Sequence, residues 1–171
     1  MSIDELVDVV DEAGNFIKVV SKKEAHENGL LHKCVVGEVI DSKGHWHLSQ
    51  ASEGKQDAKQ YISPMGGHIS AGEDEKDALI REAKEEMGFI ENLNYEYVGQ
   101  AILDRKILGR HENHILVVYK IFSDTEIVLN EEHQNTRSFT EDELKKGLKE
   151  NPEKFGEAFH FVVNNFFRNF L

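Results

Sequence analysis

The sequence is poor in cysteine and proline and has no long hydrophobic run. Its 171 residues include one cysteine, Cys34, and two prolines. A single cysteine cannot form an internal disulfide or a cysteine-rich metal cluster, which favours a reducing, cytoplasmic setting. No apolar run approaches the ~20 residues that a helix needs to cross a bilayer, so we expect no membrane-spanning segment. The first residues also lack a basic segment followed by an apolar one, so no secretory signal is expected.

Positive charge is scarce as well. Lysine and arginine number 20 against 32 aspartates and glutamates, which gives a formal net charge of −12. This balance argues against bulk electrostatic binding to nucleic acid. It also means that an anionic substrate such as a diphosphate would be repelled unless cations accompanied it. With 39% hydrophobic residues and this length, we expect one folded domain over residues 1–171.

Apolar runs and turn residues predict several strands. An N-terminal hairpin is expected at about residues 4–20, and a second hairpin over 34–40 and 45–49. Further strands are expected over 95–103 and 115–122, with loops over 50–60 and 103–112.

Helices are expected in three places. Residues 74–87 have apolar side chains at helical spacing, including Leu79, Ile80 and Met87, with Gly88 as the C-terminal cap. A capping box begins a short helix at Thr140. A phenylalanine-rich segment predicts a C-terminal helix over about 152–170 that packs on the sheet, so the chain is expected to be an α/β or α+β domain.

A helix over 74–87 would gather three glutamates. At about 100° per residue, Glu82 and Glu86 share a face beside the apolar stripe, and Glu85 lies next to them. Like charges at this spacing destabilise a helix by about 0.2–0.5 kcal/mol per pair, so the cluster calls for a cation. Mg²⁺ or Mn²⁺ suits an all-oxygen site that also takes phosphate oxygens. A solvated helix face is the alternative interpretation.

The residues before this helix form a glycine-rich segment. Gly66 and Gly67 precede His68, and a further glycine precedes Glu73. Glycines let the backbone approach a ligand closely, and amide groups near a helix N-terminus form an anion site. We therefore expect Gly66, Gly67 and His68 to contribute to substrate binding.

Together these segments resemble the Nudix box. That box runs glycine, five residues, glutamate, seven residues, then Arg-Glu-apolar-any-Glu-Glu-any-Gly-apolar. Every fixed position is matched, by Gly67, Glu73, Arg81, Glu82, Ala83, Glu85, Glu86, Gly88 and Phe89.

The resemblance implies a fold and a reaction. It implies an α/β/α sandwich with a central mixed sheet, and hydrolysis of a small-molecule diphosphate, often a nucleoside derivative, with Mg²⁺ or Mn²⁺. Glu82, Glu85 and Glu86 would bind the metal, and Arg81 would pair with Glu73 to lock the loop.

One carboxylate should deprotonate or orient the attacking water. Glu85 or Glu86 could do so, and so could a loop acid such as Glu131 or Glu132. The usual phosphate-binding arginines after residues 48–50 are missing, because Ala51 and Ser52 stand there. The candidate replacements are Lys55, Lys59, Arg105 and Arg110.

The chain also resembles the isopentenyl-diphosphate-isomerase-like branch of the family. In the isomerases, histidines at places like His26, His32 and His68, with an acidic pair of which Glu112 alone matches, help to hold a metal. In the isomerases a cysteine precedes the Gly-His pair, at the position that Gly66 occupies in this chain. This difference favours hydrolysis.

Two alternatives to a hydrolase stay open: an isomerase of isopentenyl diphosphate, and a non-catalytic sensor of a diphosphate-bearing ligand. The sequence does not identify the organic moiety of the substrate, the general base, the number of metals or the roles of His26, His32 and His114. A homodimer is compatible with the sequence, which does not determine the oligomeric state.

Overall fold

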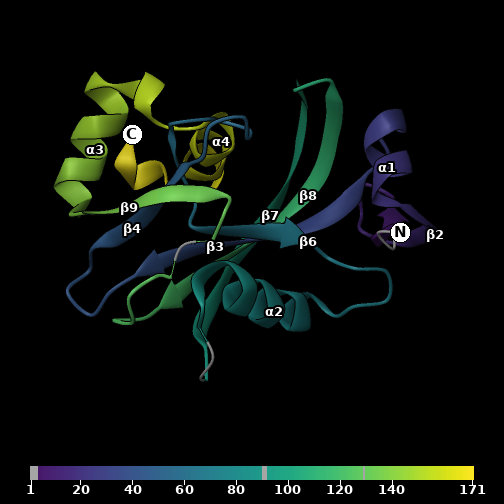
Figure 1. The fold of residues 1–171 in the computed structure, drawn as a ribbon, viewed down its shortest axis with the longest axis horizontal. Coiled ribbons are helices and arrows are strands. Elements are labelled where there is room, and N and C mark those ends of the chain that lie inside the picture. The colour runs from purple at the N-terminus through teal and green to yellow at the C-terminus, as the bar shows by residue number, and fades with distance from the viewer. Residues whose placement is uncertain (1–3, 90–91, 129) are drawn as a thin grey trace.

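A computed structural model describes residues 4–89, 92–128 and 130–171 (Figure 1). The elements in chain order are β1 (Leu6–Val10), β2 (Phe16–Ser21), α1 (Lys22–Asn28), β3 (His32–Ile40), β4 (Trp46–Ala51), β5 (Tyr61–Ile62), β6 (Met65–His68), α2 (Glu75–Met87), β7 (Asn94–Ile107), β8 (Arg110–Phe122), β9 (His133–Phe139), α3 (Glu141–Glu150), the 3₁₀ turn η1 (Pro152–Lys154), α4 (Glu157–Phe166) and η2 (Arg168–Phe170). None of the described helices is long and apolar enough to cross a membrane.

The strands form one mixed sheet. β3 and β8 run parallel, from the pair His32 and His114 to the pair Ile40 and Phe122. The other paired strands are antiparallel, including the N-terminal hairpin of β1 and β2 and the long hairpin of β7 and β8. The mixed sheet confirms the expected fold class.

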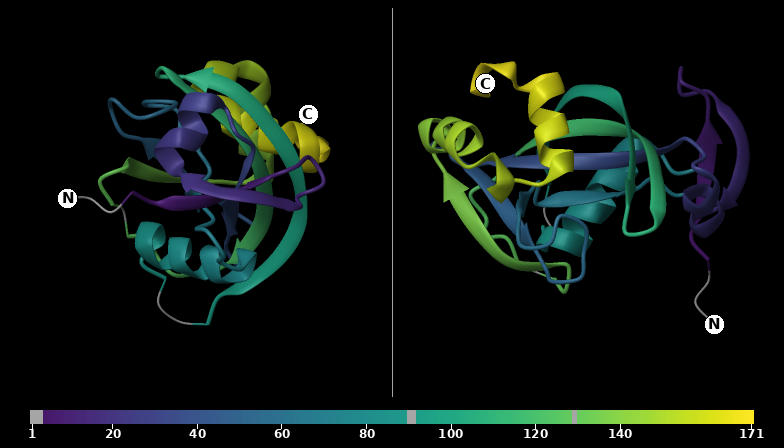
Figure 2. Two further views of the ribbon diagram at one scale, coloured as in Figure 1. Left: turned by 90° about the vertical axis from the view of Figure 1, so that its right-hand side faces the viewer. Right: turned by 90° about the horizontal axis from the view of Figure 1, so that it is seen from above.

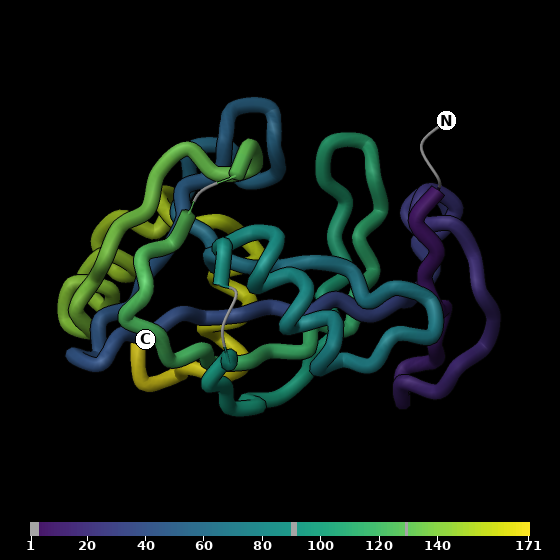
Figure 3. Tube along the Cα trace, turned by 60° about the horizontal axis from the view of Figure 1, so that its bottom comes forward, coloured from purple at the N-terminus to yellow at the C-terminus, as the bar shows by residue number. Residues whose placement is uncertain are grey.

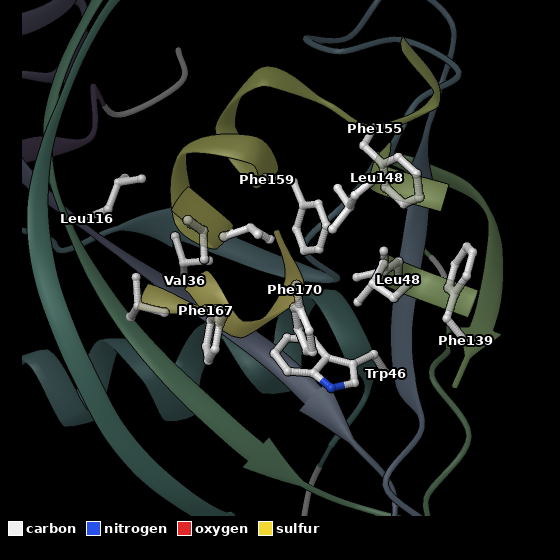
Figure 4. Close-up of a cluster of buried hydrophobic side chains, with 14 of the residues drawn as sticks. Val36, Trp46, Leu48, Leu116, Phe139, Leu148, Phe155, Phe159, Phe167 and Phe170 are labelled. Carbon is white, nitrogen blue, oxygen red and sulfur yellow. The ribbon is translucent and has the colours of Figure 1, made fainter. Parts of the chain in front are cut away.

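Helices cover both faces of the sheet. Alternating side chains of β3 point to opposite faces, so Cys34 and Val36 pack with α3 and α4, whereas Val35 and Val39 pack with α2. Figure 2 shows α2 on one side of the sheet and the C-terminal helices on the other. In Figure 4 the rings of Phe167 and Phe170 lie against Trp46, at 4.9 Å between ring centroids in each case.

Helix α2 begins and ends where its sequence predicts. The Asp74 side chain accepts a hydrogen bond from the amide of Lys76, and Gly88 takes the left-handed conformation with φ 71°. The prediction that Ile80 belongs to the apolar stripe of this helix was wrong, because Ile80 is 48% exposed. The buried face is centred near Leu79 instead and includes Glu82 and Glu86. The two glutamates therefore lie within the buried face and not on its flank.

The predicted single helix over residues 152–170 is divided. A 3₁₀ turn ends at Lys154, Phe155 is extended and buried in the core, and α4 begins after Gly156. A Cβ on Gly156 would collide with Asp57, so this glycine lets the 52–60 segment approach closely. The extended Phe155 places its ring in the core, which interrupts the helix.

Five further segments differ from the expectation or were not predicted. Residues 103–112 form the end of the β7–β8 hairpin and not a loop. The short strands β5, β6 and β9 and the seven-residue helix α1 were also missed. Helix α1 is capped by Ser21, whose hydroxyl accepts from the amide of Glu24, and by Gly29 with φ 60°. In Figure 3 the N-terminal elements β1, β2 and α1 lie at the opposite end of the molecule from the C-terminus.

Candidate functional site

The three glutamates of α2 are not equivalent. Glu82 and Glu86 are 7% and 8% exposed, whereas the side chain of Glu85 is 58% exposed. Burial raises the pKa of Glu82, and it raises the pKa of Glu86 to about 8. Two desolvated carboxylates on adjacent turns disfavour their own ionised forms, and a divalent cation would reverse this. The all-oxygen donor set fits Mg²⁺ or Mn²⁺.

Strand β6 supports these carboxylates from the sheet side. The amide of Gly66 donates to Glu86 Oε2 at 3.1 Å. A Cβ on Gly67 would overlap the carboxyl group of Glu82, so only glycine leaves room for that side chain. Gly66, Gly67 and His68, expected only as a glycine-rich segment, form part of strand β6, which pairs with β3.

Arg81 connects the helix to the preceding loop. Its Nε and Nη2 atoms donate to the two oxygens of Glu73 at 2.8 and 2.9 Å. Nη2 also donates to the carbonyl of His68 at 2.9 Å, and Nη1 to Glu82 Oε1 at 2.6 Å. The hydrogen bonds from Arg81 lower the pKa of Glu73. One guanidinium thus fixes the loop, the end of β6 and a buried carboxylate.

A cavity of about 1090 Å³ opens in front of α2 and β6. It brings together most of the residues predicted for the site. Those lining it are Lys55, Gly66, Gly67, His68, Arg81, Glu82, Glu85, Glu86, Arg105 and Glu132. Glu73 does not line the cavity, but it accepts hydrogen bonds from Arg81, which does.

The rim and the wall of the cavity hold different kinds of charge. At the rim, Lys55 Nζ lies 3.0 Å from Glu132 Oε1, and both side chains are about half exposed. Arg105 is buried in the wall, where its Nε donates to Glu112 Oε2 at 2.8 Å and its Nη1 lies 3.3 Å from Asp57 Oδ2. Lys55 is thus accessible to an anion, whereas the charge of Arg105 is balanced by two buried carboxylates.

The deeper wall is apolar. Val36, Leu103, Leu116, Phe159 and Val162 line it from β3, β7, β8 and α4. Such a surface next to acidic and basic groups can hold the organic part of a ligand whose charged part faces α2.

Four histidines converge beside the glycine strand. His26 comes from α1, His32 from the start of β3, His68 from the end of β6 and His114 from β8. One ring nitrogen of each lies within 4.8 Å of the others, so the group can hold a metal ion. Burial lowers the pKa of all four, to about 4 for His26, so neutral imidazoles are favoured.

The histidine cluster was only partly visible in the sequence. His114 joins it because the parallel pairing of β3 and β8 sets His114 beside His32. Glu112, the acid expected from the isomerase resemblance, is bonded instead by Arg105 and Gln56. The signal that could have identified His114 is its strand register, which a local motif does not contain.

Known proteins share both the sequence pattern and the fold. A family model described as NUDIX domain matches residues 30–159. An uncharacterised Nudix hydrolase of Streptomyces coelicolor is 34% identical over 88 residues, which are 51% of this chain and 49% of that protein, so the match spans about half of that relative. An isopentenyl-diphosphate Delta-isomerase of Aliivibrio fischeri is 28% identical over 169 residues, which cover 92% of each protein. A crystal structure from Deinococcus radiodurans matches with TM-score 0.76 and 19% identity over 96% of this chain and 100% of that one, which shows the shared fold.

Proposed function

The chain belongs to the Nudix family, and from this premise we propose that it hydrolyses the diphosphate bond of a nucleoside diphosphate derivative or a similar small organic diphosphate. One observation carries the proposal. Two buried carboxylates, Glu82 and Glu86, face the glycine strand inside a cavity that is large enough for such a substrate.

We assign the cation site to Glu82, Glu85 and Glu86, with Mg²⁺ or Mn²⁺ as the ion. When bound, such an ion neutralises the diphosphate and lowers the pKa of a coordinated water. Arg81 holds one oxygen of Glu82 and thereby orients the other. The amide of Gly66 holds Glu86 in the same way.

The proton of the attacking water needs an acceptor. Glu85 and Glu86 lie on the helix, and Glu132 lies across the cavity at its rim. Glu131, beside Glu132, also lines the cavity, so these four glutamates are the candidate bases. Lys55 lies beside Glu132 and can reach a phosphate oxygen by leaving its present partner. To contact a phosphate, Arg105 would have to break an ion pair with Asp57 or Glu112. We therefore assign it the role of holding the cavity wall in place.

Chromatographic separation of the phosphate-containing products from a panel of nucleoside diphosphates, their derivatives and isoprenoid diphosphates tests this function, because a substituted diphosphate gives two phosphate monoesters and an unsubstituted one releases free phosphate. We expect turnover with Mg²⁺ or Mn²⁺ that a chelator abolishes and added metal restores. Glu85→Gln and Glu86→Gln should each lower kcat strongly, whereas Glu96→Gln, an exposed change on β7, should not. Metal-dependent turnover that survives both helix changes would refute the assigned site. Tight binding without any turnover would favour a sensor.

Isomerisation of isopentenyl diphosphate is the second candidate. The similarity to the Aliivibrio fischeri isomerase over nearly the whole chain favours it, and so does the histidine cluster. Gly66 argues against it, because this position lacks the cysteine that the resemblance to the isomerases implies. Formation of dimethylallyl diphosphate without phosphate loss would establish the isomerase.

We also propose a cellular location and an oligomeric state for this protein. The single cysteine, which is buried, favours a cytoplasmic setting. A homodimer is the assembly to test, by light scattering of the purified protein at several concentrations.

A further inference from the structure

A buried carboxyl group stands behind one residue of the cavity wall. Glu38 on β3 is fully buried, and its Oε1 atom lies 2.5 Å from the hydroxyl oxygen of Ser63. The other carboxyl oxygen, Oε2, is buried without a hydrogen-bond partner within the described part of the chain. Ser63 is half-buried and lines the cavity, as do its neighbours Ile62 and Met65. Ser63 therefore connects the buried acid to the space in which a ligand would lie.

Glu38 is not neutralised by a basic residue. Its register partner on β8 is Lys120, whose ammonium group lies over the ring of Phe167, 5.7 Å from the centroid. Burial raises the pKa of Glu38 to about 7, and the hydrogen bond with Ser63 opposes this rise. No charged side chain among the described residues adds to these two effects. Below pH 7 the Glu38 carboxyl group is therefore mainly neutral.

The position of the proton on Glu38 sets the direction of the Ser63 hydroxyl group. A neutral carboxyl group has a single O–H donor. A proton on Oε2 would leave that donor unpaired in the core, so the proton lies on Oε1 and is donated to Ser63 Oγ. The hydroxyl hydrogen of Ser63 is then free to point into the cavity. When Glu38 is ionised, Ser63 donates to Glu38 and offers a ligand only its lone pairs.

Other polar groups of this wall are already paired. Gln56 donates to Glu112, and Arg105 donates to Glu112 and to Asp57. The remaining wall is the apolar surface described above. A ligand that is purely hydrocarbon would displace water from Ser63 without replacing its hydrogen bond, which loses affinity. A ligand with an acceptor atom at this position would replace it.

Ser63 lies within reach of a ligand whose phosphates face α2. It precedes Gly66 by three residues, so the Cα atoms of the two are at most about 11 Å apart. The amide of Gly66 in turn donates to Glu86. One small organic diphosphate can therefore have its charged part at α2 and its organic part at Ser63.

From these contacts we infer that Ser63, held by Glu38, is a specificity-determining residue that donates a hydrogen bond to an acceptor atom in the organic part of the substrate. A carbonyl oxygen or a ring nitrogen of a nucleobase is such an acceptor. The inference rests on the proposed function, because the diphosphate must face α2. It deepens that function by favouring nucleoside diphosphates over isoprenoid diphosphates, whose hydrocarbon chains have no acceptor. Ser63 contacts the substrate, and Glu38 is a positioning residue.

Three kinds of probe test the role of Ser63. They are the best bound of ADP, CDP, GDP and UDP, then geranyl diphosphate, which has no acceptor in its chain, and inorganic diphosphate, which has no organic part. KM is measured with MgCl₂, or Kd by titration calorimetry where a probe is not turned over. Ser63→Ala should raise the constant of the nucleoside diphosphate by about two- to tenfold, the factor that one neutral hydrogen bond supplies, with little change in kcat.

The same substitution should change the constants of the other two probes by less than twofold. Ser138→Ala, which removes an exposed serine hydroxyl on β9, is the matched control and should affect none of the probes.

The pH profile separates this role from a merely structural one and needs no change at Ser63. In Glu38→Gln the side-chain amide donates to Ser63 at every pH, so the hydroxyl hydrogen stays available to the ligand. In wild type that hydrogen turns to Glu38 as the pH rises through about 7. The ratio of KM or Kd between wild type and Glu38→Gln should therefore rise two- to tenfold from pH 6 to pH 8.5 for the nucleoside diphosphate, and not for inorganic diphosphate.

Two results would overturn the inference: an equal effect of Ser63→Ala on all three probes, or a ratio between wild type and Glu38→Gln that does not depend on pH. Failure of the hydrolase proposal is a different outcome. If nucleoside diphosphates bind without being cleaved, that proposal fails while the effect of Ser63→Ala on Kd is still expected. If they are cleaved and Ser63→Ala has no effect on KM, this inference alone fails.

Discussion

The carboxyl group of Glu82 lies against Gly67, at the position where the Cβ atom of any other residue at position 67 would stand. The contact joins β6 to α2 and holds the carboxylate within the buried face of the helix. It explains in physical terms why a glycine is needed fifteen residues before a glutamate.

We expect Gly67→Ala to displace the Glu82 carboxylate while leaving the fold intact. Residue 67 lies in a strand without a positive φ, so alanine fits the backbone. A misplacement of about 1 Å can cost about 10²-fold in rate, and a loss in kcat of this order is the expected result. Glu96→Gln, an exposed change on β7 away from the cavity, is the control. Equal activity of the two variants would contradict the steric argument.

Arg81→Lys should lower stability at neutral pH. Lysine cannot reproduce the two parallel bonds to Glu73 and the bond to the carbonyl of His68, so a loss of about 1–3 kcal/mol is expected. The pKa of Glu73 is lowered in the folded protein, so this stabilisation is present above its ordinary pKa of 4.5 and is lost as the pH falls through the folded value. Urea unfolding at pH 7 and at acidic pH should therefore show a difference between wild type and variant that shrinks with acid. Lys84→Ala on the exposed side of α2 should show no such dependence.

Glu38→Gln should change the pH dependence of stability in the opposite sense. Glu38 is fully buried on β3, and burial raises its pKa to about 7 despite a hydrogen bond from Ser63 at 2.5 Å. The folded state therefore binds a proton that the unfolded state has released, and stability falls as the pH rises from 4.5 to about 7. That fall amounts to at most about 3 kcal/mol.

The glutamine variant should lack this fall. Relative to wild type, Glu38→Gln should gain stability at pH 8 and gain little at pH 4.5, as measured by urea unfolding across this range. The exposed change Glu96→Gln provides the control. Parallel pH profiles for wild type and Glu38→Gln would show that Glu38 is ionised in the folded protein.

Arg105→Ala should destabilise the protein far more than Arg110→Ala. The Arg105 side chain is 7% exposed and balances Asp57 and Glu112, which are 8% and 5% exposed. Removing it leaves two buried carboxylates, at an expected cost of about 3–5 kcal/mol. Arg110 is 44% exposed, so its loss should cost at most about 1 kcal/mol.

Thermal unfolding and substrate kinetics together separate the two roles of Arg105. A structural role predicts a lower Tm for Arg105→Ala. A higher KM with an unchanged Tm would instead show that Arg105 contacts the phosphates and is not needed to balance the wall.

Local patterns in the sequence determined a large part of this fold. The spacing of apolar residues and the caps Asp74 and Gly88 define α2, because helix formation depends on neighbours three and four residues away. The capping box at Thr140 determines the start of α3 in the same way. Patterns failed where tertiary contacts overrode them, as at Phe155, whose ring is buried while its backbone is extended.

The sequence by itself also determined that Glu82, Glu85 and Glu86 gather on one helix, because their relative positions follow from helical geometry. Only the tertiary structure decided which of them are buried, because burial depends on how α2 packs against β6. It alone decided that His114 meets His32, since that meeting needs the parallel pairing of β3 with β8, two strands that are far apart in the sequence. Local interactions can be read from the order of residues, whereas sites that are assembled from distant segments exist only when the chain has folded.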